Sequence, residues 1–135
     1  MKNMKELKIT PSPDKLGEAT EFFENFLTEA DAPMKAIMQV NVAVDEVLSN
    51  IIRYSGATSV TLGCSLDDNR AVLSFSDDGR FYDPTAQTDP DITLSAEERE
   101  IGGLGIFMVK KMMDSVTYER RDGLNVLTLV KQLSR

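Results

Sequence analysis

The stretch that decides the fold is Asn41-Val42-Ala43-Val44-Asp45-Glu46-Val47-Leu48-Ser49-Asn50-Ile51-Ile52-Arg53-Tyr54. Its apolar residues recur at the spacing of one helical face, which predicts an amphipathic helix buried along that stripe. Glu46 and Asn50 are four residues apart, so they lie side by side on another face of the same helix. That second face carries small, apolar and amide groups where a solvated face would carry several long charges. The pair is therefore either an ordinary exposed pair or part of a site.

The length of 135 residues predicts one domain, residues 1–135, large enough to bury roughly two-thirds of its unfolded surface. An apolar share of 41% and a charged share of 27% are those of a globular protein. No run approaches the ~18 apolar residues of a membrane span, and the N-terminal residues lack the apolar region of a signal peptide. The single cysteine, Cys64, excludes an internal disulfide and fits a reducing compartment. We therefore expect a cytoplasmic protein.

The net charge of −7 disfavours nucleic acid and anionic membrane as direct partners, because phosphate contacts need a basic surface. The chain contains no histidine. Its absence excludes Ser-His-Asp and Cys-His catalysis, His-ligated zinc and a phosphohistidine on this chain. A catalytic metal would have to be a hard ion held by oxygen ligands.

Local signals predict the order strand, two helices, hairpin, irregular segment, helix, hairpin. The predicted ranges are a strand at 7–10, helices at about 16–27 and 32–54, a hairpin of 60–66 and 71–76, an irregular segment at 77–101, a helix after Gly105, and a hairpin of 116–121 and 125–130 around Asp122-Gly123. Hairpin strands with helices gathered on one face give an α+β fold, a two-layer α/β sandwich. We expect its sheet to be mixed but mostly antiparallel.

Three glycines within four residues, Gly102-Gly103-Leu104-Gly105, directly precede the last predicted helix. Such glycines leave backbone N–H groups unobstructed at a helix N-terminus, where an anion binds well. No Gly-Lys-Ser/Thr follows, so this is not a P-loop. The pattern is equally typical of a packing or hinge device, and both interpretations stay open.

The segment Asp77-Asp78-Gly79 stands where a predicted strand ends. A carboxylate there can accept a hydrogen bond from an amino group, and the glycine lets a flat ring lie against the backbone. Asp-Gly at a strand end is also a common turn.

Glu46 and Asn50 offer a third candidate site. A carboxylate can deprotonate a hydroxyl group, which is the work of a general base. An amide oxygen four residues on can complete the oxygen shell of Mg²⁺, which usually keeps several waters and substrate phosphates. Because phosphoryl transfer depends mostly on positioning and charge neutralisation, these groups and a cradle of N–H groups could suffice.

The order of these motifs resembles a known family. Glu46-x-x-x-Asn50 on a helix, Asp77-x-Gly79 after a strand and Gly103-x-Gly105 opening a helix resemble the Bergerat (GHKL) ATP-binding fold of gyrase, MutL and histidine kinases. More narrowly, the stretches 77–84, 102–114 and 125–131 look like the stand-alone anti-sigma factor serine/threonine-protein kinases, which have a histidine-kinase-like ATPase domain. The resemblance covers nearly the whole chain and is weakest before about residue 33.

This resemblance implies a role for each matching position. Glu46 would be the catalytic base and Asn50 the Mg²⁺ ligand. Asp77 would bind the adenine amino group of ATP, with Gly79 beneath the ring. The phosphate-binding turn would be formed by Gly102, Gly103, Leu104, Gly105 and Ile106.

The resemblance also implies a lid over the nucleotide at residues 85–101. Small Ala43 and apolar Val42 would then leave room for the ligand, and Asp45, about 100° around the helix from Glu46, would lie on the surface. One departure concerns the wider fold's Asp-x-Gly-x-Gly, because Phe81 replaces its second glycine. Another is Arg53, near the helix end where relatives often carry histidine.

The implied function is an ATP- and Mg²⁺-dependent serine protein kinase that doubles as an anti-sigma factor in partner switching. It would phosphorylate a serine on an anti-anti-sigma (STAS-domain) partner and sequester a sigma factor, as a homodimer. One alternative is a related switch kinase that regulates a phosphatase or signalling protein without binding a sigma factor. Another is a non-catalytic module in which nucleotide only sets the affinity for a partner.

Overall fold

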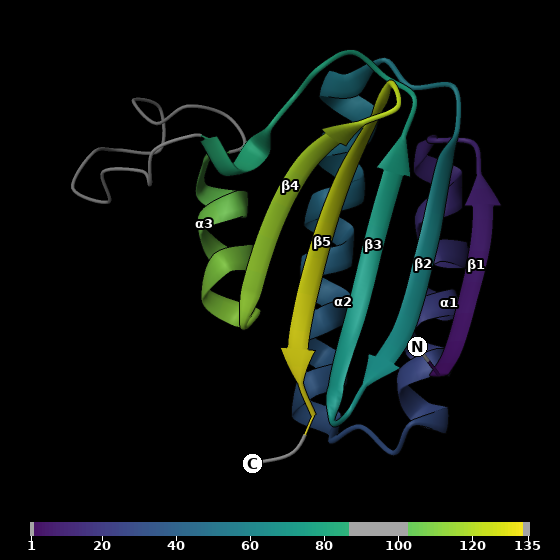
Figure 1. Ribbon diagram of the computed structural model, residues 1–135, viewed down its shortest axis with the longest axis vertical. Coiled ribbons are helices and arrows are strands. Elements are labelled where there is room, and N and C mark those ends of the chain that lie inside the picture. Colours follow the sequence, from purple (N-terminus) through teal and green to yellow (C-terminus); the bar gives the residue numbers. More distant parts are fainter. Residues whose placement is uncertain (1, 87–102, 134–135) are drawn as a thin grey trace.

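In the computed structural model, which describes residues 2–86 and 103–133, five strands form one sheet in the order β1-β2-β3-β5-β4 (Figure 1). The strands are β1 (Lys2–Ile9), β2 (Val60–Asp67), β3 (Arg70–Asp77), β4 (Ser115–Arg121) and β5 (Leu124–Gln132). All four neighbouring pairs are antiparallel. The prediction of a mixed sheet is therefore wrong. β3 and β4 do run in the same direction, but β5 lies between them and pairs with both, so no parallel pair forms in the described sheet.

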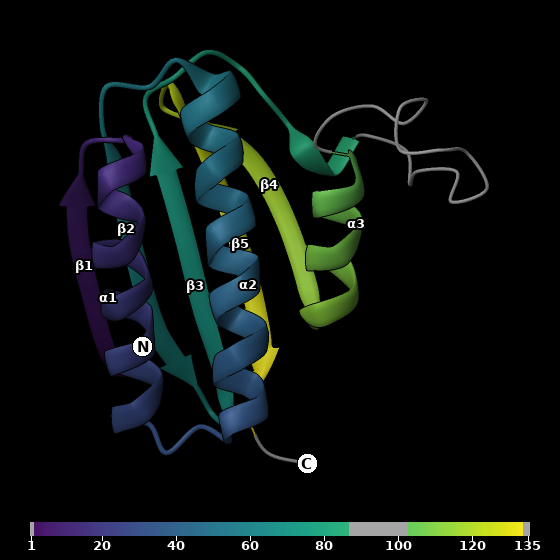
Figure 2. The ribbon, with the colours of Figure 1, turned by 180° about the vertical axis from the view of Figure 1, so that it is seen from behind.

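Three α-helices cover one face of this sheet: α1 (Leu16–Glu29), α2 (Met34–Asn50) and α3 (Gly103–Met112). Figure 2 shows α2 crossing β3 and β5, with α1 on one side of it and α3 on the other. The predicted α+β two-layer sandwich is confirmed. Within residues 2–86 and 103–133, none of the helices has the length and apolar character that crossing a membrane requires.

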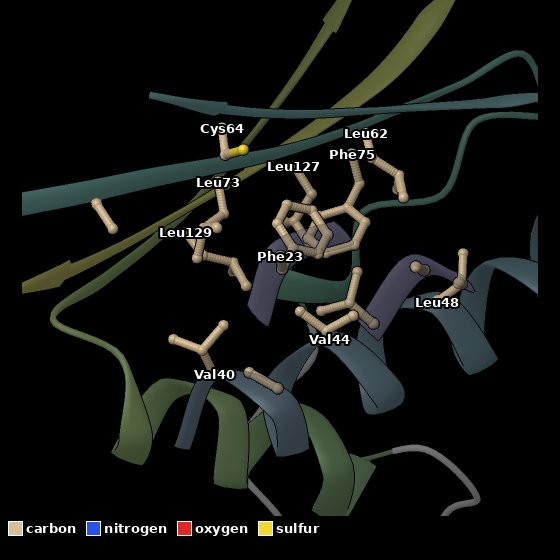
Figure 3. Packing of buried hydrophobic residues seen from close by; sticks show 14 of the residues in the cluster. Phe23, Val40, Val44, Leu48, Leu62, Cys64, Leu73, Phe75, Leu127 and Leu129 are labelled. Carbon is tan, nitrogen blue, oxygen red and sulfur yellow. The ribbon is translucent and has the colours of Figure 1, made fainter. Parts of the chain in front are cut away.

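The core lies between the helices and the sheet (Figure 3). Along β3, residues Ala71, Leu73 and Phe75 are fully buried while their neighbours are half-buried, because successive strand residues point to opposite faces. The same alternation carries Asp77, the last residue of β3, onto the helix-covered side. On β5, it places Asn125 on that side as well, directly opposite Asp77.

The end of α2 departs from regular α-helix. The predicted helix to residue 54 is an α-helix as far as Asn50 and continues as a π-helix, η2 (Ile51–Ser55). Gly56 follows with a φ of 68°, the left-handed conformation that commonly ends a helix. The helical segment therefore ends within one residue of the predicted end at about residue 54. π-helical turns are uncommon and occur frequently at functional sites.

Two short 3₁₀ helices complete the described elements, η1 (Pro13–Lys15) before α1 and η3 (Pro84–Ala86) after β3. The hairpin turn between β4 and β5 has positive φ at both central residues, 54° at Asp122 and 79° at Gly123. That geometry is the type I′ turn that the Asp-Gly dipeptide predicts.

Candidate functional site

A pocket lies where the C-terminal end of α2 meets the end of β3 and the start of β5. The space of about 310 Å³ within it includes part of the open solvent at its mouth. Its lining residues are Val47, Asn50, Ile51, Asp77, Tyr82, Pro84, Ile106, Tyr118, Asn125 and Leu127. Three predicted site residues from three different elements, Asn50, Asp77 and Ile106, therefore meet in one pocket.

Asp77 is a buried carboxylate with only 3% of its surface exposed. Its Oδ1 accepts hydrogen bonds from the backbone N–H of Gly79 at 2.9 Å and from Nδ2 of Asn125 at 3.1 Å. Both of these hydrogen bonds go to the same oxygen atom, Oδ1. Oδ2 is the atom that can accept a hydrogen bond from a ligand in the pocket.

Asn125 organises the wall around Asp77. Its Oδ1 accepts hydrogen bonds from the hydroxyl of Tyr118 at 2.6 Å and from Nη1 of Arg120 at 3.0 Å. Its Nδ2 also donates to the carbonyl oxygen of Arg80 at 2.7 Å. Asn125 is not among the predicted site residues. The signal that could have found it is an asparagine at a core-facing position of a strand, where an amide needs buried partners.

Two tyrosines give the pocket a neutral polar rim. Burial, with a smaller contribution from Tyr54, raises the pKa of Tyr82, and burial also raises the pKa of Tyr118. Both phenols are therefore protonated at neutral pH. The rings of Tyr54 and Tyr82 pack with centroids 5.8 Å apart, which connects η2 to the segment after β3.

Gly79 has a structural reason to be glycine. A Cβ atom there would lie 2.4 Å from the carbonyl oxygen of Ser55 and 2.8 Å from its Cβ, closer than real side chains approach. The backbone of the β3–η3 segment lies against η2 at this point, and Arg80 N–H donates to Ser55 O at 2.9 Å. Gly79 therefore fits the loop to the helix end, and its predicted place beneath an adenine ring stays a prediction.

Asp78 faces away from the pocket. Its carboxylate accepts the backbone N–H groups of Thr58 at 2.7 Å and Ser59 at 3.1 Å, and it also accepts the Thr58 hydroxyl. These hydrogen bonds, that of the Thr58 hydroxyl above all, lower the pKa of Asp78. The two adjacent aspartates therefore differ in role. Asp77 lines the pocket, whereas Asp78 connects the end of β3 to the residues that precede β2.

Glu46 and Asn50 lie near each other on α2, as predicted. Asn50 is 2% exposed and its Nδ2 has no hydrogen-bond partner among residues 2–86 and 103–133, so the interpretation as an ordinary exposed pair is wrong for Asn50. The Glu46 side chain is 28% exposed, whereas Asp45 lies on the surface as expected. Nη2 of Arg53 lies 3.3 Å from Oδ1 of Asn50 and 3.9 Å from Oε2 of Glu46.

The expectation that Val42 and Ala43 leave room for a ligand is wrong. Ala43 is fully buried in the core and Val42 is 46% exposed, and neither lines the pocket. Val42 and Ala43 lie eight and seven residues before Asn50, about 12 and 10 Å away along the helix axis, so they do not reach the pocket at the end of α2.

The glycine-rich segment opens α3. Gly103 is the first residue of this helix and Gly105 lies in its first turn. Ile106 is 2% exposed and lines the pocket beside Asn50 and Asp77. Gly102 lies outside the described residues, and so do residues 87–101 of the predicted lid.

Among the described residues, the oxygen ligand predicted for Mg²⁺ is the side-chain amide oxygen of Asn50, and no cluster of further ligands surrounds it. Residues 2–86 and 103–133 hold no group of three or more His, Cys, Asp or Glu side chains that could bind a metal. The amide oxygen of Asn50 beside the Glu46 carboxylate suits an ion held mainly by nucleotide phosphates and waters. Nδ2 of Asn50, which has no partner in the described part of the chain, is a buried donor that a phosphate oxygen would satisfy.

The histidine kinase-like ATPase domain is the family whose sequence pattern matches residues 9–131. A serine/threonine-protein kinase, BtrW of Bordetella bronchiseptica, is 30% identical over 94 residues, which span 67% of this chain and 66% of that protein. The serine-protein kinase RsbW of Listeria monocytogenes is 22% identical over 90% of this chain and 82% of its own length. An anti-sigma F factor of Clostridium acetobutylicum is 22% identical over 98% of this chain and 94% of its own.

Among solved structures, the RsbU and RsbW domains of Rv1364c from Mycobacterium tuberculosis superimpose with a TM-score of 0.68 at 17% identity. The match covers 97% of this chain and 33% of that one. At this level of identity the likeness shows a shared fold.

Proposed function

The chain belongs to the histidine kinase-like ATPase domain family, and on that premise we propose that it is an ATP-dependent serine protein kinase that acts as an anti-sigma factor. The observation that carries the proposal is the meeting of Asn50, Asp77 and Ile106 in one pocket beside Glu46. These residues come from α2, β3 and α3, so only the fold brings them together. The names of the relatives in Bordetella, Listeria and Clostridium support the same class of activity.

Asp77 binds the adenine of ATP in this proposal. Its Oδ1 is already occupied by Gly79 and Asn125, so Oδ2 accepts the hydrogen bond of the exocyclic amino group. A guanine would present a carbonyl oxygen at that position and leave a buried carboxylate facing an acceptor. The carboxylate therefore selects ATP over GTP.

The phosphates lie between the start of α3 and the end of α2. Backbone N–H groups of Gly103, Leu104, Gly105 and Ile106 are in the first turn of α3, where a helix leaves its donors free and favours negative charge. Gly102 precedes them in the proposed turn. Asn50 would hold Mg²⁺ through Oδ1, and the ion would neutralise charge on the transferred phosphoryl group.

Glu46 is the proposed general base. It lies one helical turn before Asn50 on the same face of α2, partly exposed, where a hydroxyl from a second protein can reach it. A serine hydroxyl that donates its proton to the Glu46 carboxylate attacks the γ-phosphorus. The bond from that phosphorus to the β–γ bridging oxygen breaks, ADP leaves, and phosphoserine forms. A protein that only binds nucleotide needs no general base, so the presence of Glu46 beside Asn50 favours a kinase.

The proposed partners are an anti-anti-sigma (STAS-domain) protein, which carries the acceptor serine, and a sigma factor, with the kinase as a homodimer. A sigma factor acts in the cytoplasm, so this partner also places the kinase there. A pull-down from the source cell, followed by mass spectrometry, tests the assignment. A sigma factor among the captured proteins supports it, whereas a phosphatase or signalling protein in its place points to the related switch kinase.

The nucleotide site is tested by thermal unfolding. Mg·ATP at about 100 times its Kd should stabilise the fold by about 2.7 kcal/mol, and Asn50→Ala should lose most of this gain. Asn69→Ala, in the exposed β2–β3 turn, is the matched control and should keep it. An unchanged Tm of the unmodified protein with millimolar Mg·ATP would count against the whole assignment.

A further inference from the structure

One guanidinium nitrogen lies between the two residues to which phosphoryl transfer is assigned. Nη2 of Arg53 is 3.3 Å from Oδ1 of Asn50, the proposed metal ligand, and 3.9 Å from Oε2 of Glu46, the proposed base. The same nitrogen makes both contacts. A positive charge from the chain itself therefore stands beside the oxygen atom to which Mg²⁺ is assigned.

The position of Arg53 follows from the end of the helix. The three residues stand at i, i+4 and i+7, so they share one face, and Arg53 lies in η2, where the α-helix has become a π-helix. The guanidinium carbon of Arg53 lies 5.6 Å from the ring centroid of Tyr54, a cation–π distance. The helix end therefore directs this charge toward Glu46 and Asn50.

The contacts that hold Arg53 are weak enough to be exchanged. Its side chain is 49% exposed, its hydrogen bond to Asn50 is long, and its separation from Glu46 is at the limit of an ion pair. A half-exposed ion pair of this kind contributes little to the stability of the fold. The position of Arg53 means that its guanidinium is the cation in contact with Asn50 Oδ1 when no metal is bound.

We propose that Arg53 is an internal cation that competes with Mg²⁺ for Asn50 Oδ1, an inference that rests on the proposed function. In the nucleotide-free protein, Arg53 neutralises Glu46 and occupies the amide oxygen of Asn50. When ATP and Mg²⁺ bind, the Arg53 guanidinium would leave Asn50 Oδ1. That oxygen would then hold the metal, and the Glu46 carboxylate would accept the proton of the serine. Arg53 thus sets the Mg²⁺ concentration at which the site is filled.

The test is a Mg²⁺ titration of Arg53→Met and the unmodified protein, each saturated with a fluorescent non-hydrolysable ATP analogue. Because nucleotide is saturating, a change in its own affinity does not enter the comparison. Removing the competing cation should lower the half-saturating Mg²⁺ concentration about two- to fivefold. Arg70→Met is the control, since Arg70 is also 49% exposed and pairs with Asp67 at 2.9 Å in the distant β2–β3 turn. It should leave the titration unchanged.

NMR gives a second readout without turnover. Arg53→Met should shift the side-chain amide resonances of Asn50 in the nucleotide-free protein and leave them close to those of the unmodified protein once Mg²⁺ and the analogue are bound. A half-saturating Mg²⁺ concentration that is unchanged or higher in Arg53→Met overturns the role of Arg53 while the kinase assignment stands. If the unmodified protein does not bind the analogue, or if the fluorescence of the bound analogue does not respond to Mg²⁺, the proposed function fails and this inference fails with it.

Discussion

Asn125 on β5 donates a hydrogen bond of 3.1 Å from its Nδ2 to Oδ1 of Asp77, the residue directly opposite it on β3. The bond fixes one oxygen of the carboxylate and turns the other toward the pocket. A residue on the last strand thus orients the carboxylate to which adenine binding is assigned. The proposed role of Asp77 in adenine binding therefore depends on Asn125, and Asn125 acts only through Asp77.

Asn125→Ala should weaken ATP binding by about tenfold, because the Asp77 carboxylate loses the hydrogen bond that orients it and must be ordered when ATP binds. The variant also leaves the Tyr118 hydroxyl without its acceptor and removes one of the two acceptors of Arg120 Nη1, so its Tm should fall. Calorimetric titration with Mg·ATP and thermal unfolding measure the two effects. Asn69→Ala should change neither the ATP affinity nor the Tm. Unaltered ATP affinity in Asn125→Ala would show that Asp77 does not need the hydrogen bond from Asn125.

Asp77→Asn and Asp78→Asn form a matched pair of neighbours. Asp77→Asn should reduce ATP affinity about 10- to 100-fold and narrow the preference for ATP over GTP, since the carboxylate is the proposed acceptor for the adenine amino group. Asp78→Asn should keep the affinity, because its carboxylate faces Thr58 and Ser59. Competition binding with both nucleotides measures this. Equal losses in the two variants would contradict the assignment of adenine binding to Asp77.

The free energy of unfolding should depend on pH through the carboxyl group of Asp78. Hydrogen bonds from Thr58 and Ser59 lower its pKa in the folded protein, so its contribution is fully present above the unfolded value of about 3.9. That contribution is lost as the pH falls through the lowered pKa. Denaturant unfolding should therefore find Asp78→Asn less stable than the unmodified protein near neutral pH, with a difference that shrinks in acid. A difference that stays constant down to the lowest pH would show that the charge of Asp78 does not matter.

Cys64 offers a probe of unfolding. It is 2% exposed on the helix-covered side of β2, and burial raises the pKa of its thiol to about 12. The thiolate is the reactive form, so the native protein should react with a thiol reagent far more slowly than the unfolded chain at mildly alkaline pH. Absorbance with Ellman's reagent follows the reaction, and bound Mg·ATP should slow it further. Rapid labelling of the native protein would mean that β2 opens without global unfolding.

Local features were predictable because local sequence determines them. The apolar spacing of residues 41–54 predicted α2, and Asp122-Gly123 predicted the type I′ turn between β4 and β5. The placement of β5 between β3 and β4 was not predictable in this way. It depends on contacts between segments far apart in the chain, so the sheet was wrongly expected to be mixed.

The same distinction applies to the candidate site. Glu46 and Asn50 share a helix, so their proximity follows from helical geometry alone. Asn125 meets Asp77 only through the register of β3 and β5, which no single motif contains. Arg53 takes its place through a π-helical turn, a feature without a reliable sequence signal.

The role of Glu46 gives the most direct test of the kinase assignment. Glu46→Gln keeps the shape of the side chain and removes the base, while Asp45→Asn changes the adjacent carboxylate on the surface of α2. The measurement is phosphorylation of the captured partner's serine from Mg·ATP, read by mass spectrometry, with nucleotide binding checked in parallel. We expect Glu46→Gln to bind Mg·ATP and lose transfer by at least about a hundredfold, and Asp45→Asn to retain both. Equal transfer by Glu46→Gln and the unmodified protein would contradict the account.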